Sequence, residues 1–302
     1  METAKRVLVA IRPRSLFASA ASVAITLALL ALKEGSLRVV TRVDALCTLA
    51  IAVLVQMTAN LNASYSNFHR AFNPMQAPKT KDNKIVINIL SDKILRMWSW
   101  LFMALILALI AVAQFTGRRK KLKVAGFSTA LAVVSFLYCR RTKPLAAVGV
   151  QELVFGLAYG PIAMASTALV VVGSVPIGVV LYSIAVLCFA VAFQILQSTA
   201  DAPFTRRLGI EASSLAVTLG YDRAFQAFVL FITCAYGVLA LSILVQGHLP
   251  NVVLLLTMGS VRDICDAFRE EKVRQLPDQL ATLAAQLSGG LLVSIALSSW
   301  IV

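Results

Sequence analysis

Long apolar stretches, separated by polar connections, fill most of this chain. Each holds roughly 18–25 residues, enough for a helix to cross the hydrocarbon core of a bilayer, about 30 Å thick. We place about nine predicted spans, of which the eighth is the shortest, at residues 15–32, 45–66, 95–116, 122–139, 150–172, 175–197, 224–246, 249–262 and 280–302. Backbone polar groups inside a membrane must be paired within their own segment, so the pattern predicts helices. We therefore expect an all-α, polytopic transmembrane helical bundle.

Composition agrees with one membrane domain over residues 1–302. The chain is 59% hydrophobic with a mean hydropathy of +0.82, whereas soluble domains are about 45–50% apolar. The first apolar stretch is too long for the apolar core of a removable signal peptide, so we interpret it as the first span. The formal net charge of +14 would suggest nucleic acid in a soluble protein. Here the basic residues lie between spans, so we expect a lipid bilayer as partner and no nucleic acid.

The basic residues also predict an orientation. They gather near the N-terminus and in the connections after spans two, four, six and eight, while residues 173–174 and 247–249 are nearly neutral. Cytoplasmic loops carry the excess of Lys and Arg, so we expect a multi-pass integral membrane protein with a cytoplasmic N-terminus. The cluster at residues 118–123 disagrees, because it lies on the predicted far side.

Two polar stripes interrupt this apolar pattern, at residues 56–67 and 194–207. The residues that share one helical face are Asn60, Ser64 and Asn67 in the first stripe, and Gln194, Ser198, Asp201 and Thr205 in the second. Amides, hydroxyls and a carboxylate are costly in lipid, so both faces should point into the bundle and mark a site. Hydrogen bonding between helices is the structural alternative for Asn60 and Gln194.

A pair of such helix ends suits a diphosphate site. Carboxylate-rich helix ends normally hold Mg²⁺, which bridges diphosphate oxygens, while Arg and Lys neutralise the remaining charge. The first stripe lacks carboxylates, and this absence is the main departure from that pattern.

Several further segments carry a family resemblance. They are Ile11–Leu16, Lys81–Ile85, Tyr138–Pro144, Asp201–Gly209 and Leu215–Gly220. With the two stripes, they resemble the UbiA superfamily of intramembrane prenyltransferases, closest to its menaquinone-type branch, over nearly the whole chain. The resemblance implies about nine helices, a prenyl diphosphate donor, Mg²⁺, and a lipophilic or aromatic acceptor.

The motifs depart from the family at their acids. Ala-Ser-Tyr-Ser-Asn at residues 63–67 stands where the family has Asn-Asp-x-x-Asp, and Thr205 stands where Asp201 should have an acidic partner. By resemblance, Asp201 and Asn67 are the candidate catalytic and metal-binding residues. The candidate diphosphate-binding residues are Arg12, Asn60, Asn62, Ser64, Lys143, Gln197, Ser198, Thr205 and Arg206. No convincing general base stands out, and we expect Gly156, Gly160 and Pro161 to give close packing or a kink.

The sequence favours a membrane prenyltransferase with a weakened Mg²⁺ site. A terpene cyclase acting on a prenyl diphosphate, and an isoprenoid-binding scaffold without turnover, remain open alternatives. A transporter is less favoured, because the chain has no clear pair of Gly- or Pro-interrupted helices in two halves.

Overall fold

The computed structural model describes residues 13–71, 92–116, 149–207, 215–247, 249–270, 272 and 275–301. Within these ranges the regular structure is entirely helical, with no strand, so the predicted fold class is confirmed. The helices in chain order are α2 (Pro13–Glu34), the 3₁₀ helix η1 (Leu37–Val39), α3 (Val43–Ala71), α5 (Asp92–Thr116), α7 (Val150–Leu157), the π-helical turn η3 (Ala158–Ile162), α8 (Ala163–Val171), α9 (Ile177–Arg207), α10 (Leu215–Leu219), α11 (Tyr221–Gln246), the 3₁₀ helix η4 (Leu249–Thr257), α12 (Met258–Arg269) and α13 (Leu276–Ile301).

The predicted spans coincide with these helices, apart from residues 122–139, which lie outside the described residues. The eighth span is divided between η4 and α12. By length and composition, the helices able to cross a membrane are Val43–Leu61, Glu152–Val171, Ile177–Ala200, Tyr221–Gln246 and Asp278–Ser298. Met97–Val112 is apolar but shorter. Both polar stripes lie within single helices, because α3 and α9 continue past the predicted ends of their spans.

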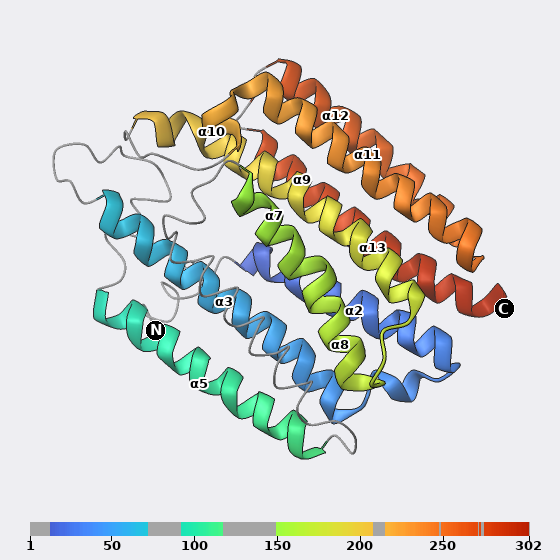
Figure 1. Ribbon diagram of the computed structural model, residues 1–302. Helices are drawn as coiled ribbons and strands as arrows, with labels where there is room; N and C mark the ends of the chain where they lie inside the picture. The colour runs from blue at the N-terminus through green and yellow to red at the C-terminus, as the bar shows by residue number, and fades with distance from the viewer. Residues whose placement is uncertain are drawn as a thin grey trace.

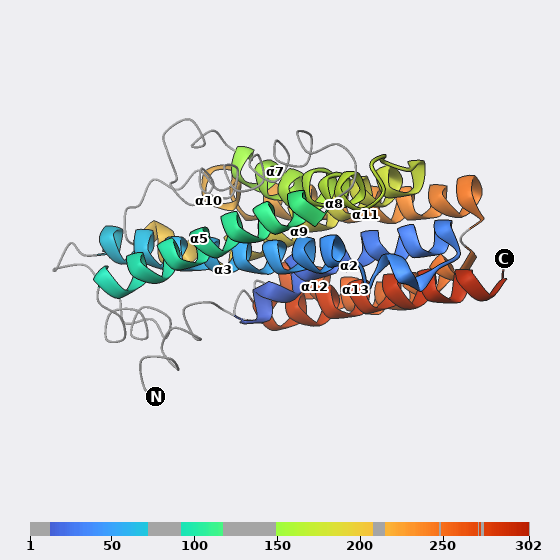
Figure 2. The same cartoon turned by 90° about the horizontal axis from the view of Figure 1, so that it is seen from below.

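The helices run roughly alongside one another and give the bundle two distinct ends (Figures 1 and 2). We call the end at which α3 and α9 finish, after Ala71 and Arg207, the stripe end. The opposite end, here called the turn end, carries the α2–α3 connection and the turns at Gly173 and Gly247. These two glycines have φ values of 79° and 70°, in the left-handed region that favours glycine after a helix.

Helix α9 is the central element of the bundle. It packs against α7, α8, α10, α11 and α13. Ala185, Ala192 and Ile195 are completely buried along it. A helix that is apolar on all sides belongs in the interior, so the sequence of α9 explains its position. The second polar stripe therefore continues from a buried helix.

The face of α7 and η3 that meets α9 is closely packed. A Cβ added to Gly160 would lie 2.4 Å from the carbonyl oxygen of Ser183, and one added to Gly156 would lie 2.5 Å from Val191 Cγ2. Pro161 lies inside the π-helical turn between α7 and α8. The expected close packing is confirmed, and proline disrupts the α-helical pattern at this point.

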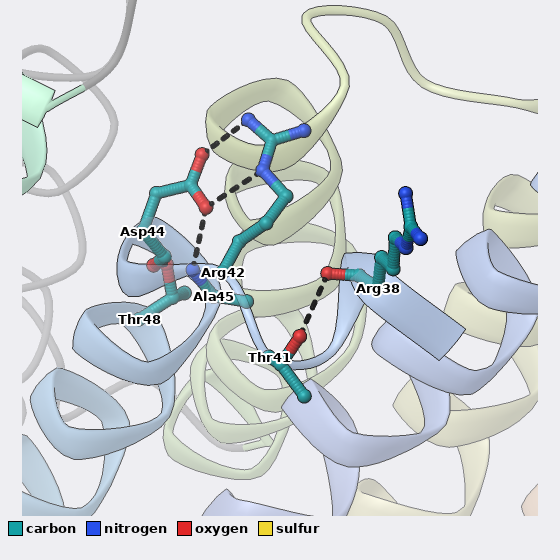
Figure 3. A network of polar contacts seen from close by, with 6 residues as sticks. All are labelled: Arg38, Thr41, Arg42, Asp44, Ala45 and Thr48. Atoms are coloured by element: carbon teal, nitrogen blue, oxygen red, sulfur yellow. Dashed lines mark hydrogen bonds and ion pairs between the residues drawn. The ribbon is translucent and has the colours of Figure 1, made fainter. Parts of the chain in front are cut away.

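An ion pair organises the α2–α3 connection at the turn end (Figure 3). Arg42 donates to Asp44 through both Nη2, at 2.6 Å, and Nε, at 3.1 Å. Asp44 Oδ1 also accepts the backbone N–H of Ala45 at 2.9 Å. The carboxylate lies in the first turn of α3, where it complements the positive end of the helix dipole.

Candidate functional site

The inner part of the first stripe lies inside the bundle, as predicted. Gln56, Thr58 and Asn60 are buried on α3. Gln56 donates from Nε2 to Asn60 Oδ1 at 3.0 Å, and Thr58 donates to the carbonyl of Leu54 at 2.9 Å. These contacts lie within α3, so the inner part of the stripe is held in place by its own helix.

The outer part of the first stripe continues along the same helix. Asn62, Ser64 and Asn67 belong to α3, although their side chains are outside the described part of the structure. Arg12 and Lys143 also lie outside the described residues, as does most of the long connection at residues 68–94.

The inner part of the second stripe is buried at the end of α9. Ser198 and Thr199 donate to the carbonyl of Ile195 at 3.0 Å and 2.7 Å, and Gln197 is half-buried. The predicted residues Asp201, Thr205 and Arg206 occupy the last turns of α9, and their side chains are not described.

The two stripe-bearing helices share their neighbours. Both α2 and α8 pack against α3 and against α9. Figures 1 and 2 agree that α3 and α9 finish at the same end of the bundle, where α7 begins and α10 lies. The fold therefore gathers the last turns of both stripes at one end, as expected if they serve one site.

The structure adds one residue that our sequence analysis missed, Glu152 in the first turn of α7. Its side chain is buried, with 1% exposure. Oε1 accepts the backbone N–H of Leu215, the first residue of α10, at 3.0 Å. Ser198 Oγ lies 3.5 Å from the same oxygen. An acid within the predicted span 150–172 was the available signal, since an ionisable residue inside a span marks a functional site by default.

The second oxygen of Glu152 is different. Oε2 is buried and accepts no hydrogen bond from any described residue. A Ser198 hydroxyl has one proton and lies closer to the Ile195 carbonyl than to Glu152, so it contributes little to the carboxylate. Glu152 is therefore an incompletely paired acid at the stripe end.

Among the described side chains, no group of three or more His, Cys, Asp or Glu residues gathers closely enough to hold a metal ion. The buried oxygen donors described in the two stripes and beside them are amides, hydroxyls and the carboxylate of Glu152. Such oxygens can bind phosphate donors and hard cations, but Mg²⁺ sites depend mainly on carboxylates. Asp201 adds a second acid on the adjacent turn of α9.

Comparison with known proteins identifies the fold. No protein-family model and no curated protein sequence matches this chain. The apo structure of a UbiA homolog from Aeropyrum pernix K1 is 16% identical, has a TM-score of 0.65, and aligns over 90% of this chain and 97% of its own. A UbiA homolog from Archaeoglobus fulgidus is 16% identical with a TM-score of 0.65, covering 98% and 100% of the two chains.

A UbiA homolog from Archaeoglobus fulgidus bound to GPP and Mg²⁺ matches with a TM-score of 0.64 at 14% identity, again over 98% and 100% of the two chains. The similarity therefore covers nearly the whole of each molecule. It shows that this chain has the helical fold of the UbiA homologues, as the sequence resemblance implies. The described part of the chain has five apolar helices of spanning length, and with this fold it is an integral membrane protein.

Proposed function

We propose that this chain is a membrane prenyltransferase, which moves a prenyl group from a prenyl diphosphate to an aromatic or other lipophilic acceptor. One observation carries the proposal: two helices with polar stripes finish at the same end of a bundle whose fold matches a UbiA homolog bound to GPP and Mg²⁺. An apolar bundle with one polar end suits a substrate with a charged head and a long apolar tail.

The stripe end is the proposed site of the diphosphate. The side chains that we propose to bind it are Arg12, Asn60, Asn62, Ser64, Lys143, Gln197, Ser198, Thr205 and Arg206. Amides and hydroxyls donate hydrogen bonds to phosphate oxygens, and the basic residues oppose their charge. The buried side chains Leu61, Ile195 and Leu196 border the inner parts of the two stripes. The interior next to the stripe end is therefore apolar.

In the proposed reaction, the bond between the allylic carbon and the diphosphate oxygen breaks, and its electron pair leaves with the diphosphate. The acceptor forms the new bond to the allylic carbon and then loses a proton. Apolar side chains around the allylic carbon exclude water, which would otherwise capture the cation as an alcohol.

A divalent cation is part of this proposal. Asp201 and Asn67 would hold Mg²⁺, which when bound would neutralise charge on the leaving diphosphate. The oxygen chemistry of the stripes fits such a cation, and the orphaned buried oxygen of Glu152 supports a positively charged partner at this end. The loss of the family's first-stripe acids predicts weaker Mg²⁺ binding than a carboxylate-rich site would give.

The test uses the purified full-length protein in detergent, with labelled geranylgeranyl diphosphate and Mg²⁺, in the presence and absence of a dihydroxynaphthalene acceptor. Metal-dependent diphosphate release with a prenylated product supports the proposal. Release with a hydrocarbon product identifies a cyclase instead, and binding without release identifies a scaffold. If the labelled diphosphate does not bind at all, the assignment of the site is wrong.

A further inference from the structure

Glu152 is a buried acid whose two oxygens have unequal surroundings. Oε1 accepts the N–H of Leu215 at 3.0 Å, whereas Oε2 receives no hydrogen bond from the described residues. No ion pair joins Glu152 to a basic side chain in the described part of the chain. Removing a carboxylate from water is costly unless its charge is compensated. A positively charged partner is therefore expected beside Oε2.

The position of Glu152 relates it to the second stripe. Oε1 lies 3.5 Å from Ser198 Oγ, and Ser198 precedes Asp201 by three residues in α9. A helix rises about 1.5 Å per residue, so the backbone of Asp201 lies about 4.5 Å further along the helix axis. Glu152 also contacts Leu215, where α10 begins beyond this stripe. The carboxylate thus lies at the end of the bundle at which we place the diphosphate.

A purely structural role explains only half of this side chain. Holding the Leu215 N–H requires one acceptor oxygen, which a neutral glutamine would also supply. The negative charge complements the positive end of α10, but Oε2 receives no hydrogen bond from the described residues in that role. A hard divalent cation, by contrast, binds carboxylate oxygens preferentially, and the first stripe has none to offer.

We propose that Glu152 supplies a carboxylate ligand, through Oε2, to the divalent cation that accompanies the prenyl diphosphate. In this way an acid on α7 compensates in part for the acids missing from the first stripe. The inference rests on the function proposed above, but it concerns a residue that belongs to neither stripe.

The test compares the wild type with Glu152→Gln, which keeps an oxygen for Leu215 but removes the charge. Glu34→Gln, an exposed acid at the turn end, is the matched control. Binding of the unreactive analogue geranyl S-thiolodiphosphate is measured at increasing Mn²⁺, together with thermal unfolding in detergent. We expect Glu152→Gln to weaken the Mn²⁺ dependence of binding by about 10- to 100-fold, in line with losses at metal sites.

Thermal unfolding without a divalent cation gives an independent readout. If Oε2 is a cation ligand, Glu152→Gln should leave the melting temperature of the cation-free protein unchanged or raise it. Mn²⁺ with the analogue should then raise the melting temperature of the wild type more than that of Glu152→Gln. A lower melting temperature for Glu152→Gln, with unchanged Mn²⁺ dependence, would mean that Glu152 pairs with a basic side chain of the protein. That result would overturn the inference.

Glu152→Asp keeps the test decisive if the glutamine variant folds poorly. Aspartate retains the charge on a shorter side chain, so it should recover part of the Mn²⁺ dependence. If Glu152→Asp binds the analogue with the full Mn²⁺ dependence of the wild type, shortening the side chain has not displaced a ligand, and cation binding by Glu152 is refuted. If the wild type fails to bind the analogue at any Mn²⁺ concentration, the proposed function itself fails. If the wild type binds the analogue and the Glu152 variants show the same Mn²⁺ dependence, only the present inference is overturned.

Discussion

Most buried hydroxyls in the described part of the chain donate a hydrogen bond within their own helix. Thr26, Thr167 and Thr199 each donate to a backbone carbonyl four residues earlier in the same helix. Such residues need no ligand and no partner helix, because their hydrogen bonds are complete within one turn. Glu152 and Asn251 differ, since their polar contacts join separate helices. These two residues therefore deserve separate explanations, one functional and one structural.

Asp201 is the residue whose replacement should affect turnover most directly. Its carboxylate is the one acid of the second stripe and the proposed cation ligand, so Asp201→Ala should lower diphosphate release by about 100-fold or more. The measurement is release from labelled geranylgeranyl diphosphate at saturating Mg²⁺. Asp263→Ala, at an exposed position on α12, is the matched control and should retain activity. Turnover that survives Asp201→Ala would show that the site has been assigned to the wrong residues.

Asn251 is the structural counterpart of Glu152, at the turn end of the bundle. Its Nδ2 donates to Tyr182 Oη and Ser242 Oγ, both at 2.8 Å, and its Oδ1 accepts Ser294 Oγ at 2.5 Å. One amide thus joins α9, α11 and α13 through the start of η4. Both the nitrogen and the oxygen of its amide are hydrogen-bonded inside the protein, so this network requires no ligand.

Replacing Asn251 by Leu should destabilise the protein without touching the stripe end. The change removes a hydrogen-bond partner from three buried hydroxyls. Leaving a buried polar group without its partner lowers the free energy of unfolding by about 1–3 kcal/mol. Thermal unfolding in detergent measures the effect. Gln286→Leu removes an exposed amide that binds only Ser260 among the described contacts, and it should cost less than about 0.5 kcal/mol. Equal stability of the two variants would contradict a structural role for the network.

The ion pair of Arg42 and Asp44 offers a test of charge burial. The side chain of Asp44 is 5% exposed and that of Arg42 is 46% exposed. Arg42→Ala leaves the buried carboxylate without its cation, so we expect a loss of about 1–3 kcal/mol in thermal unfolding. Adding Asp44→Asn to that variant should restore part of the stability, because the amide oxygen still accepts the Ala45 N–H without a charge. A double variant less stable than Arg42→Ala would contradict this reasoning.

At the scale of elements, the sequence predicts the helices well and their contacts poorly. Apolar length identifies the spans, and Gly156, Gly160 and Pro161 indicate a tightly packed, irregular segment. The helical spacing of the stripe residues also indicates that α3 and α9 continue past their apolar spans. The contacts of Glu152 could not be predicted, since they join residues 46 and 63 positions apart. Only the packing of α7, α9 and α10 brings these groups together.

The π-helical segment gives a prediction about packing between elements. Gly160→Ala places a methyl group 2.4 Å from the carbonyl oxygen of Ser183, a backbone atom that cannot move aside alone. We expect a loss of about 1–3 kcal/mol from overpacking, measured by thermal unfolding. Gly289→Ala in α13 is the matched control, because a Cβ there meets nothing within 4 Å. It should be neutral or stabilising, since alanine favours a helix by about 1 kcal/mol over glycine.

At the scale of the whole molecule, the two ends of the bundle have different chemistry. The stripe end gathers the last turns of α3 and α9 and the carboxylate of Glu152. The turn end carries tight glycine turns, the neutralised pair of Arg42 and Asp44, and the Asn251 network. The chemistry that we propose thus belongs to one membrane face, and the other face serves to join helices.

This polarity predicts which end faces the cytoplasm. At the stripe end, α3 and α9 lead into the basic connections after spans two and six, and the basic connection after span four leads into α7. The positive-inside rule therefore places that end in the cytoplasm. In a cysteine-free variant expressed in a bacterial inner membrane, an impermeant maleimide added to spheroplasts should label Ser174→Cys at the turn end. It should label Asp222→Cys, in the first turn of α11, only after the membrane is opened. The reverse result would place the stripe end outside the cytoplasm. The basic cluster at residues 118–123, on the predicted far side, would then be cytoplasmic. A cytoplasmic site would also receive its prenyl diphosphate from the cytoplasmic side, because a charged diphosphate does not cross lipid unaided. Orientation and substrate supply are therefore one question for this molecule, and the labelling pattern answers both.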